Sequence, residues 1–213
     1  MFDGITFDQR GLAPCVVQDF STGEVLTLAY VSEESLQMTF ETGDLHFHSR
    51  SRDELWRKGE TSGNFLRLRQ LRYDCDGDAL LAIVDPVGPA CHTGERSCFY
   101  RELRGPGNGA TTAPSAPAPA AHEALPTLER TLADRAVQRP TGSYTVQLLD
   151  DPALIGEKVE EEAEEVVRAG REESDERVAE EAADLIFHLS VLLTSRGVPQ
   201  AAVMEVLNGR RGQ

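Results

Sequence analysis

The pattern of hydrophobic and polar positions changes about halfway along this chain of 213 residues. In the first half, short apolar runs stand between Gly, Pro and Asp residues, which is typical of β-strands joined by turns. The predicted strands are VVQDF (16–20), VLTLAYV (25–31), DLHFHSR (44–50), FLRLRQLRY (65–73) and ALLAIVD (79–85). Asp76-Gly77 is a strong hairpin signal between the last two runs. The alternative is one continuous strand without a turn at these residues. It would place Asp74, Asp76 and Asp78 on one face and Cys75 on the other.

Helical periodicity appears once in the first half and dominates the second half. SEESLQMTFETG (32–43) predicts a helix that Ser32 caps and Gly43 ends. In IGEKVEEEAEEVVRAG (155–170), apolar residues recur at helical spacing at Ile155, Val159, Ala163 and Val166 or Val167. A further helix, RVAEEAADLIFHLSVLL (177–193), is expected to direct Leu185, Leu189 and Leu192 into a core.

A segment of different composition separates the two patterns. Residues 105–122, GPGNGATTAPSAPAPAAH, contain no acidic or basic residue apart from His122. Such a segment cannot bury a core and is predicted to be a flexible linker. The sequence therefore predicts an α+β chain, with a mainly-β domain over residues 1–104 and an all-α domain over residues 123–213.

The formal net charge of −15 argues against a protein that coats nucleic acid or an anionic membrane. It suits a protein that binds cations, and its acids are unevenly spread. Residues 1–104 carry a net charge of −6, and residues 151–186 alone carry −10. There is no secretory signal at the start and no apolar stretch near the ~18 residues that span a bilayer, so a cytoplasmic location is expected.

Four cysteines in a reducing compartment are more often metal ligands or free thiols than disulfides. Cys91 and Cys98, in CHTGERSC, are seven positions apart, which is wider than the usual gap in a zinc knuckle. Ordinary buried cysteines are the alternative for this pair. Cys15, in APCVVQD, is expected to be such a buried cysteine.

The acidic turn around Cys75 gathers three carboxylates, from Asp74, Asp76 and Asp78. Hard carboxylates suit Mg²⁺, whereas a soft thiolate suits Zn²⁺. An EF-hand loop is excluded, because the glycine and glutamate that it needs at its sixth and twelfth positions are absent. A plain acidic turn in water is the alternative.

Residues 48–64, HSRSRDELWRKGETSGN, form a basic island in an acidic chain. Guanidinium groups, hydroxyls and close backbone N–H groups are suited to a phosphate or phosphoribosyl group. A solvated basic turn with Trp56 as local core is the alternative. The candidate substrate-binding residues of the island are Arg50, Arg52, Trp56, Lys58, Thr61 and Ser62.

SRSRDELWRKGETSG, DCDGDALL and GPACHTGERSC, in this order, closely resemble phosphoribosyl-AMP cyclohydrolase of histidine biosynthesis. The resemblance covers most of residues 10–101, with His48 standing where an aromatic residue is more usual. It implies zinc on Cys75, Cys91 and Cys98, and magnesium on Asp74, Asp76 and Asp78. Three protein ligands leave zinc a position for a water that attacks C6 of the purine ring and opens the N1–C6 bond.

The same resemblance implies a homodimer, because this family shares its zinc between two subunits. Cys75 would come from one chain, and Cys91 and Cys98 from the other. His92, beside Cys91, is a candidate proton carrier or a group that orients a ligand.

The second half resembles phosphoribosyl-ATP pyrophosphatase of the all-α E-E-x-x-E / E-x-x-D nucleotide pyrophosphatase superfamily. The resemblance covers residues 123–209 and includes KVEEEAEEVV, ADLIFHLSVLL and PTGSYT, with Glu160 in place of the expected glycine. The implied magnesium ligands are Glu161, Glu162, Glu165, Glu181 and Asp184, with Glu165 also catalytic. Magnesium would assist the attack of water on the α–β linkage of the triphosphate. Solvated acidic helix faces are the alternative.

Together the two resemblances imply a bifunctional enzyme that binds nucleotides, ATP-derived substrates among them. Removal of pyrophosphate from phosphoribosyl-ATP yields phosphoribosyl-AMP, which is the substrate of the first half. Three alternatives remain at this point. The helical half is a general nucleoside-triphosphate pyrophosphatase, or the chain is a non-enzymatic zinc module with acidic helices that bind a partner, or one half is kept only for assembly.

Overall fold

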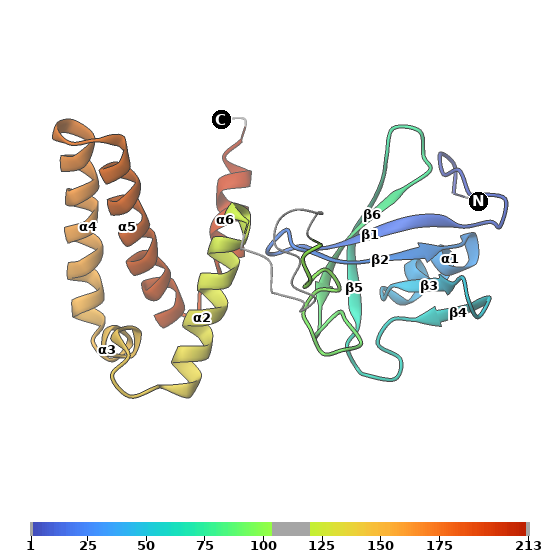
Figure 1. Ribbon diagram of the computed structural model, residues 1–213, viewed down its shortest axis with the longest axis horizontal. Helices are drawn as coiled ribbons and strands as arrows, with labels where there is room; N and C mark the ends of the chain where they lie inside the picture. Colours follow the sequence, from blue (N-terminus) through green and yellow to red (C-terminus); the bar gives the residue numbers. More distant parts are fainter. Residues whose placement is uncertain (1, 104–119, 212–213) are drawn as a thin grey trace. The chain divides into compact units, whose positions relative to one another are not determined.

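A computed structural model of the chain describes residues 2–103 and 120–211. The chain divides into two compact units, Met1–Ala118 and Pro119–Gln213, of which the first is rich in strands and the second is helical (Figure 1). This arrangement confirms the predicted α+β fold class. Most of the predicted linker, residues 105–122, lies outside the described residues. None of the described helices combines the length and the apolar character that crossing a membrane requires.

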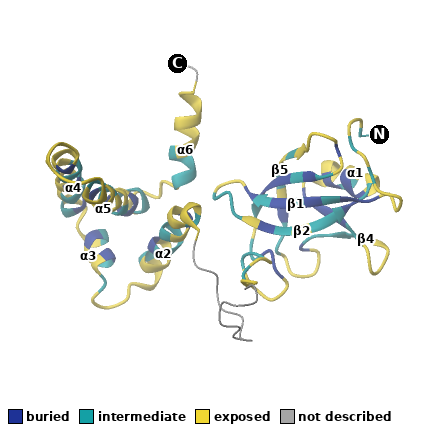
Figure 2. Cartoon of the chain, turned by 45° about the horizontal axis from the view of Figure 1, so that its top comes forward, coloured by how far each residue is buried: buried dark blue, intermediate teal, exposed yellow. Residues whose placement is uncertain are grey.

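The described strands of the first unit form a four-stranded sheet and a separate two-stranded sheet. They are β1 (Ala13–Asp19), β2 (Val25–Val31), β3 (His46–Ser49), β4 (Glu54–Arg57), β5 (Leu66–Tyr73) and β6 (Leu80–Pro86). The larger sheet has the order β2-β1-β6-β5, in which β1 pairs antiparallel with β2 and parallel with β6. Alternate residues of β1 are buried, as expected for a strand with one face on the core (Figure 2).

The five predicted strands are present, with ends that differ by a few residues, and β4 is an additional strand. β4 has only four residues, two of them charged, so no alternation marks it in the sequence. It forms because it pairs antiparallel with β3, which places Phe47 opposite Trp56 with ring centroids 5.3 Å apart. Pairing with β3, and not the local sequence, therefore explains why β4 forms.

The helix α1 (Glu33–Thr42) begins and ends where its sequence predicts. The Ser32 hydroxyl accepts a hydrogen bond from the Ser35 N–H, and the Ser35 side chain accepts one from the Ser32 N–H in return. Gly43 ends the helix in the left-handed conformation, with φ of 77°. These local caps explain why a short helix in a strand-rich half is readable from the sequence.

The acidic turn lies between β5 and β6, which are antiparallel, so the hairpin prediction is confirmed and the straight strand is wrong. Gly77 has φ of +75° in this turn. A Cβ atom at Gly77 would lie 2.1 Å from the Gly4 carbonyl oxygen, and the Gly77 carbonyl accepts a hydrogen bond from the Thr6 N–H at 2.7 Å. The segment before β1 therefore packs directly on the acidic turn.

The substitution Gly77→Ala is expected to destabilise the sheet-rich unit by about 3 kcal/mol. About 1 kcal/mol comes from the left-handed backbone and the rest from the collision with Gly4. Gly11→Ala is the matched control, because Gly11 has φ of +73° and open space around its Cα, so it should cost about 1 kcal/mol. Denaturant unfolding measures both changes, and equal losses would show that the collision carries no weight.

The described helices of the second unit are η1 (Ala121–Glu123), α2 (Ala124–Gln138), α3 (Tyr144–Asp150), α4 (Pro152–Glu172), α5 (Asp175–Ser195) and α6 (Gln200–Gly209). The long pair α4 and α5 contains the two helices predicted from periodicity. Their small core includes Ile155 and Val191, together with Leu132 and Leu148. Leu192 packs on this core as predicted, but Leu189 is 41% exposed, so its predicted core position is wrong for this chain.

Candidate active sites

A cavity of about 760 Å³ opens in the sheet-rich unit, between β2, the β3–β4 pair and the loop that contains Cys91 and Cys98. Its lining brings the basic island and the thiol loop together. The predicted site residues that line it are Arg52, Trp56, Lys58, Thr61, Ser62, Cys91, His92 and Cys98. Arg50 does not line this cavity. Its guanidinium lies 3.8 Å from the centroid of the Tyr30 ring.

The thiols of Cys91 and Cys98 line the same cavity, and each affects the pKa of the other. Cys91 is 6% exposed, and its Sγ accepts a hydrogen bond from the Thr93 hydroxyl at 3.1 Å, which lowers the pKa of the Cys91 thiol. Desolvation raises the pKa of the Cys98 thiol, although a hydrogen bond with Thr27 opposes the shift. A pair of adjacent thiols, one of them biased toward the thiolate, fits a soft cation such as Zn²⁺.

Lys58 links the thiols to the hydroxyl-bearing loop after β4. Burial lowers the pKa of the Lys58 ammonium, and the nearby thiols of Cys98 and Cys91 raise it in part. Its Nζ donates a hydrogen bond to the Asn64 carbonyl at 3.4 Å. The side chain therefore places a positive charge inside the cavity, close to both thiols.

His92 also belongs to this cavity. Its Nδ1 lies 3.9 Å from the Cys91 Sγ, and the residue is exposed. The ring is thus beside a candidate metal ligand and open to a molecule that enters the cavity, as a proton carrier must be.

The acidic turn between β5 and β6 forms a second cluster. Oxygen atoms of Asp74, Asp76 and Asp78 lie within 4.8 Å of one another, and all three residues are exposed. The charges of Asp76 and Asp74 raise the pKa of the Asp78 carboxyl. Three hard oxygens that repel one another fit a hard divalent cation such as Mg²⁺.

Cys75 belongs to this turn and not to the cavity. It is exposed, and its Sγ lies 3.9 Å from the Asp76 carboxylate. Within residues 2–103 and 120–211, no compact group of potential metal ligands joins Cys75 to Cys91 and Cys98. One chain therefore brings together two of the three predicted zinc ligands.

A third cluster lies between α4 and α5. Carboxylate oxygens of Glu162, Glu165 and Glu181 lie within 4.8 Å of one another, and Glu162 and Glu181 are buried. Burial raises the pKa of the Glu181 carboxyl, and the acids Glu165 and Asp184 add to the shift, whereas Arg177 opposes it. Buried carboxylates at this spacing fit one or more Mg²⁺ ions.

The other two predicted magnesium ligands flank this cluster. Glu161 forms an ion pair with Lys158, with an Nζ to Oε2 distance of 2.5 Å. Asp184 is exposed, and its negative charge contributes to the raised pKa of the Glu181 carboxyl. The structure thus gathers three of the five predicted acids at one point and leaves two at its edge.

Some contacts at the sites have no clear signal in the sequence. The Thr27 hydroxyl reaches Cys98 from the middle of β2, where nothing local marks a threonine as part of a site. In the helical unit, His188 Nε2 lies 3.0 Å from the Tyr144 hydroxyl and Nδ1 lies 3.5 Å from the Glu162 carboxylate. Tyr144 lies in the PTGSYT motif, which is the one hint available in the sequence.

Comparison with known proteins gives matches in both halves of the chain. The family model for phosphoribosyl-AMP cyclohydrolase matches residues 27–100, and the model for phosphoribosyl-ATP pyrophosphohydrolase matches residues 125–211. Histidine biosynthesis bifunctional protein HisIE of Bacillus subtilis is 43% identical over 212 residues, which cover 99% of this chain and 97% of that protein. The proteins of the same name from Halalkalibacterium halodurans and Thermosynechococcus vestitus are 44% and 45% identical, with 98% of this chain covered and 96% and 95% of theirs.

Proposed function

Because this chain belongs to the bifunctional family that joins a phosphoribosyl-AMP cyclohydrolase to a phosphoribosyl-ATP pyrophosphohydrolase in histidine biosynthesis, we propose two consecutive hydrolyses at separate sites. The helical unit removes pyrophosphate from phosphoribosyl-ATP, and the sheet-rich unit opens the purine ring of the resulting phosphoribosyl-AMP. The observation that carries the proposal is the cavity of about 760 Å³. Its lining brings together two thiols, a histidine, and the basic and hydroxyl side chains that are proposed to bind phosphate.

In the sheet-rich unit, the basic side of the cavity binds the phosphoribosyl groups. Arg52 and Lys58 supply positive charge, and the hydroxyls of Thr61 and Ser62 supply hydrogen bonds. Trp56 offers an aromatic face for the purine ring. These groups orient the substrate so that C6 of the purine lies toward the thiol side of the cavity.

The thiol side is proposed to hold zinc on Cys91, Cys98 and Cys75 of a second copy of the chain. Zinc bound there supplies Lewis acidity and lowers the pKa of water toward neutrality. His92 accepts the proton of the attacking water and returns it to N1 of the purine when the N1–C6 bond breaks. The proposed homodimer is supported by the separation of Cys75 from the other two thiols within one chain.

In the helical unit, the cluster of Glu162, Glu165 and Glu181 is proposed to hold Mg²⁺, with Glu161 and Asp184 at its edge. Magnesium supplies charge neutralisation at the triphosphate. Glu165 orients the water that attacks the α-phosphorus, and the bond to the bridging α–β oxygen breaks. Pyrophosphate and phosphoribosyl-AMP are the products.

Magnesium at Asp74, Asp76 and Asp78 neutralises the turn beside Cys75. The domains are residues 1–104 and 123–213, joined by a linker over 105–122. A cytoplasmic location is supported by the four cysteines, which are all free thiols.

Product analysis from phosphoribosyl-ATP tests the proposed function. Protein stripped of metals and supplied with Mg²⁺ alone is expected to accumulate phosphoribosyl-AMP and pyrophosphate, because only the thiol site depends on zinc. Addition of Zn²⁺ should then produce the ring-opened product. Chromatography of the nucleotides measures both steps.

Two results would contradict the assignment. Hydrolysis of ATP and deoxynucleoside triphosphates as fast as phosphoribosyl-ATP would indicate a general pyrophosphatase in the helical unit. No turnover with either metal would indicate a binding module without catalysis.

A further inference from the structure

The loop that carries Cys91 and Cys98 has neither helix nor strand between the two thiols. Zinc requires its sulfur ligands about 2.3 Å away, with a tolerance of about 0.2 Å. A segment without regular secondary structure meets this requirement only when other contacts fix it.

Backbone hydrogen bonds hold part of this loop. The Cys91 N–H donates a hydrogen bond to the Glu95 carbonyl at 3.0 Å, which closes the loop on itself. The Cys98 N–H donates to the Leu26 carbonyl at 2.8 Å, and the Ser97 hydroxyl donates to the Val25 carbonyl at 2.8 Å. These bonds attach the end of the loop near Cys98 to β2, and they leave the side of the loop that carries Cys91 without a link to β2.

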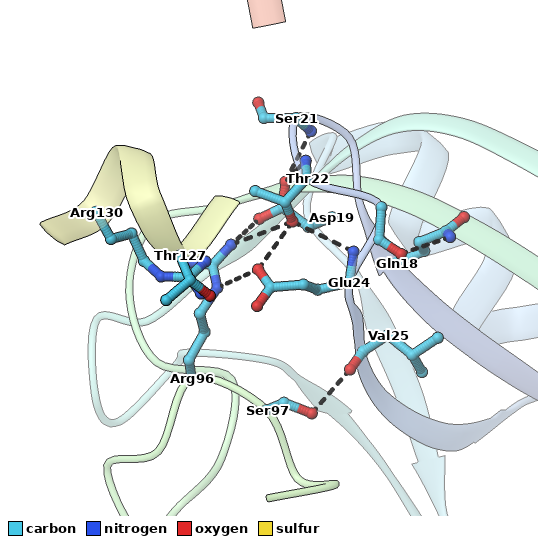
Figure 3. Close-up of polar contacts among 11 residues, drawn as sticks. Gln18, Asp19, Ser21, Thr22, Glu24, Val25, Arg96, Ser97, Thr127 and Arg130 are labelled. Carbon is cyan, nitrogen blue, oxygen red and sulfur yellow. Dashed lines mark hydrogen bonds and ion pairs between the residues drawn. The ribbon is translucent and has the colours of Figure 1, made fainter. Parts of the chain in front are cut away.

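The side chain of Arg96 supplies a second attachment, to the turn between β1 and β2 (Figure 3). Its Nη2 donates to the Asp19 carboxylate at 2.6 Å, and its Nε donates to the Glu24 carboxylate at 2.7 Å. The Asp19 side chain is 4% exposed, and its other oxygen accepts hydrogen bonds from the N–H groups of Ser21 and Thr22. Asp19 is therefore a fixed acceptor at the end of a core strand.

The Arg96 contacts also act on the Cys91 side of the loop. The Arg96 carbonyl accepts a hydrogen bond from the Ala90 N–H at 3.1 Å, so the backbone of Arg96 is bonded to the residue that precedes Cys91. A planar guanidinium that bridges two carboxylates has little freedom to rotate. The backbone of Arg96 is therefore held in place relative to the sheet. Because Ala90 is hydrogen-bonded to this backbone, both ends of the loop are held as well.

We propose that Arg96 is a positioning residue, which acts through Asp19 and Glu24 to hold Cys91 and Cys98 in the arrangement that binds zinc. The inference rests on the proposed function, since it takes the thiol pair as a zinc site. Arg96 does not touch the substrate in this role. Its effect is on the zinc affinity and, through the metal, on the rate of ring opening.

The test measures the zinc affinity of the full chain by competition with a chromophoric chelator. Arg96→Lys keeps the charge and loses the planar fork. The pair Arg96→Gln with Asp19→Asn removes the guanidinium together with its more deeply buried partner, so that the Asp19 carboxylate is not left buried without a cation. The control is Arg69→Gln, which breaks an exposed ion pair with Asp85 elsewhere in the same unit.

The double variant is expected to bind zinc about 10- to 100-fold more weakly than the wild type, as for other groups that orient metal ligands. Arg96→Lys should retain part of the affinity, and the control should retain all of it. At subsaturating zinc, kcat for ring opening should fall while KM for phosphoribosyl-AMP is unchanged, because the phosphate-binding groups are untouched. The unfolding midpoint of the zinc-free double variant should equal that of the control.

Unchanged zinc affinity in the double variant would overturn the inference and leave the proposed function standing. A loss of affinity that only tracks a lower unfolding midpoint would also overturn it, since Arg96 would then act on general stability. A wild-type chain that binds no zinc through these thiols would overturn both the inference and the proposed cyclohydrolase mechanism.

Discussion

Replacement of Cys91 by serine is expected to stop ring opening while pyrophosphate release continues at the wild-type rate. A serine hydroxyl does not ionise near neutral pH and offers no soft ligand to zinc. The rate of ring opening should fall by more than about 100-fold, because the loss of a group that only hydrogen-bonds to a metal ligand already costs about 10- to 100-fold. Chromatography should show phosphoribosyl-AMP accumulating from phosphoribosyl-ATP.

Glu165→Gln is the counterpart and should have the reverse effect. It removes one charge from the cluster with Glu162 and Glu181, so pyrophosphate release should fall by more than about 100-fold. Phosphoribosyl-AMP supplied directly should still be opened. Glu164→Gln is the matched control, because Glu164 is the adjacent residue on α4 and is exposed outside the cluster.

The two variants together test whether the sites are separate. Cys15→Ala is the second control, because it removes a thiol that is buried in the core and whose pKa burial raises to about 12. A folded Cys91→Ser or Glu165→Gln protein that lost both activities would refute the assignment of one reaction to each unit.

Mixed dimers are expected to recover ring opening from two chains that are each inactive. The chains carry Cys75→Ser and Cys91→Ser, and a shared site needs Cys75 from one copy and the Cys91–Cys98 loop from the other. Each mixed dimer then has one complete site out of two. With equal amounts and free exchange, half of the dimers are mixed, so about a quarter of the wild-type activity should return.

The control for this experiment mixes Cys91→Ser chains with Cys98→Ser chains. Both changes lie on the same loop, so no combination of two such chains completes a site. Recovery in this control would point to another cause than shared ligands. Absence of recovery with Cys75→Ser, once subunit exchange is verified by mass spectrometry of tagged chains, would refute the shared site.

The elements that the sequence predicts correctly are those specified by neighbouring residues. Ser32 and Gly43 set the ends of α1, and Asp76-Gly77 sets the β5–β6 turn, because caps and turns depend on the local backbone. The sequence does not indicate that β1 lies between β2 and β6. Alternation of apolar residues tells which face of a strand is buried, but not which strand lies beside it.

The candidate sites follow the same division. The dense motifs that contain Lys58 and Cys91 predict that both belong to a site, and the structure places both on one cavity. Arg50 and Arg52 are equivalent by composition, yet only Arg52 lines that cavity. The ion pair between Arg96 and Asp19 joins residues 77 positions apart, and no local pattern marks such a pair.

The parallel pairing of β1 with β6 has a consequence for synthesis of the chain on the ribosome. Cys15 pairs with Leu80, so β1 leaves the ribosome long before the strand that completes its second edge. Until then one edge of β1 is unpaired in the nascent chain, and the apolar residues of β1 are not fully covered, which makes this edge prone to aggregation. In the helical unit, in contrast, the most extensive packing is between α4 and α5, which are adjacent in the sequence and can therefore pack soon after they are synthesised. The sheet-rich unit is synthesised first but completes its sheet late. It therefore has a greater need of protection by chaperones than the helical unit.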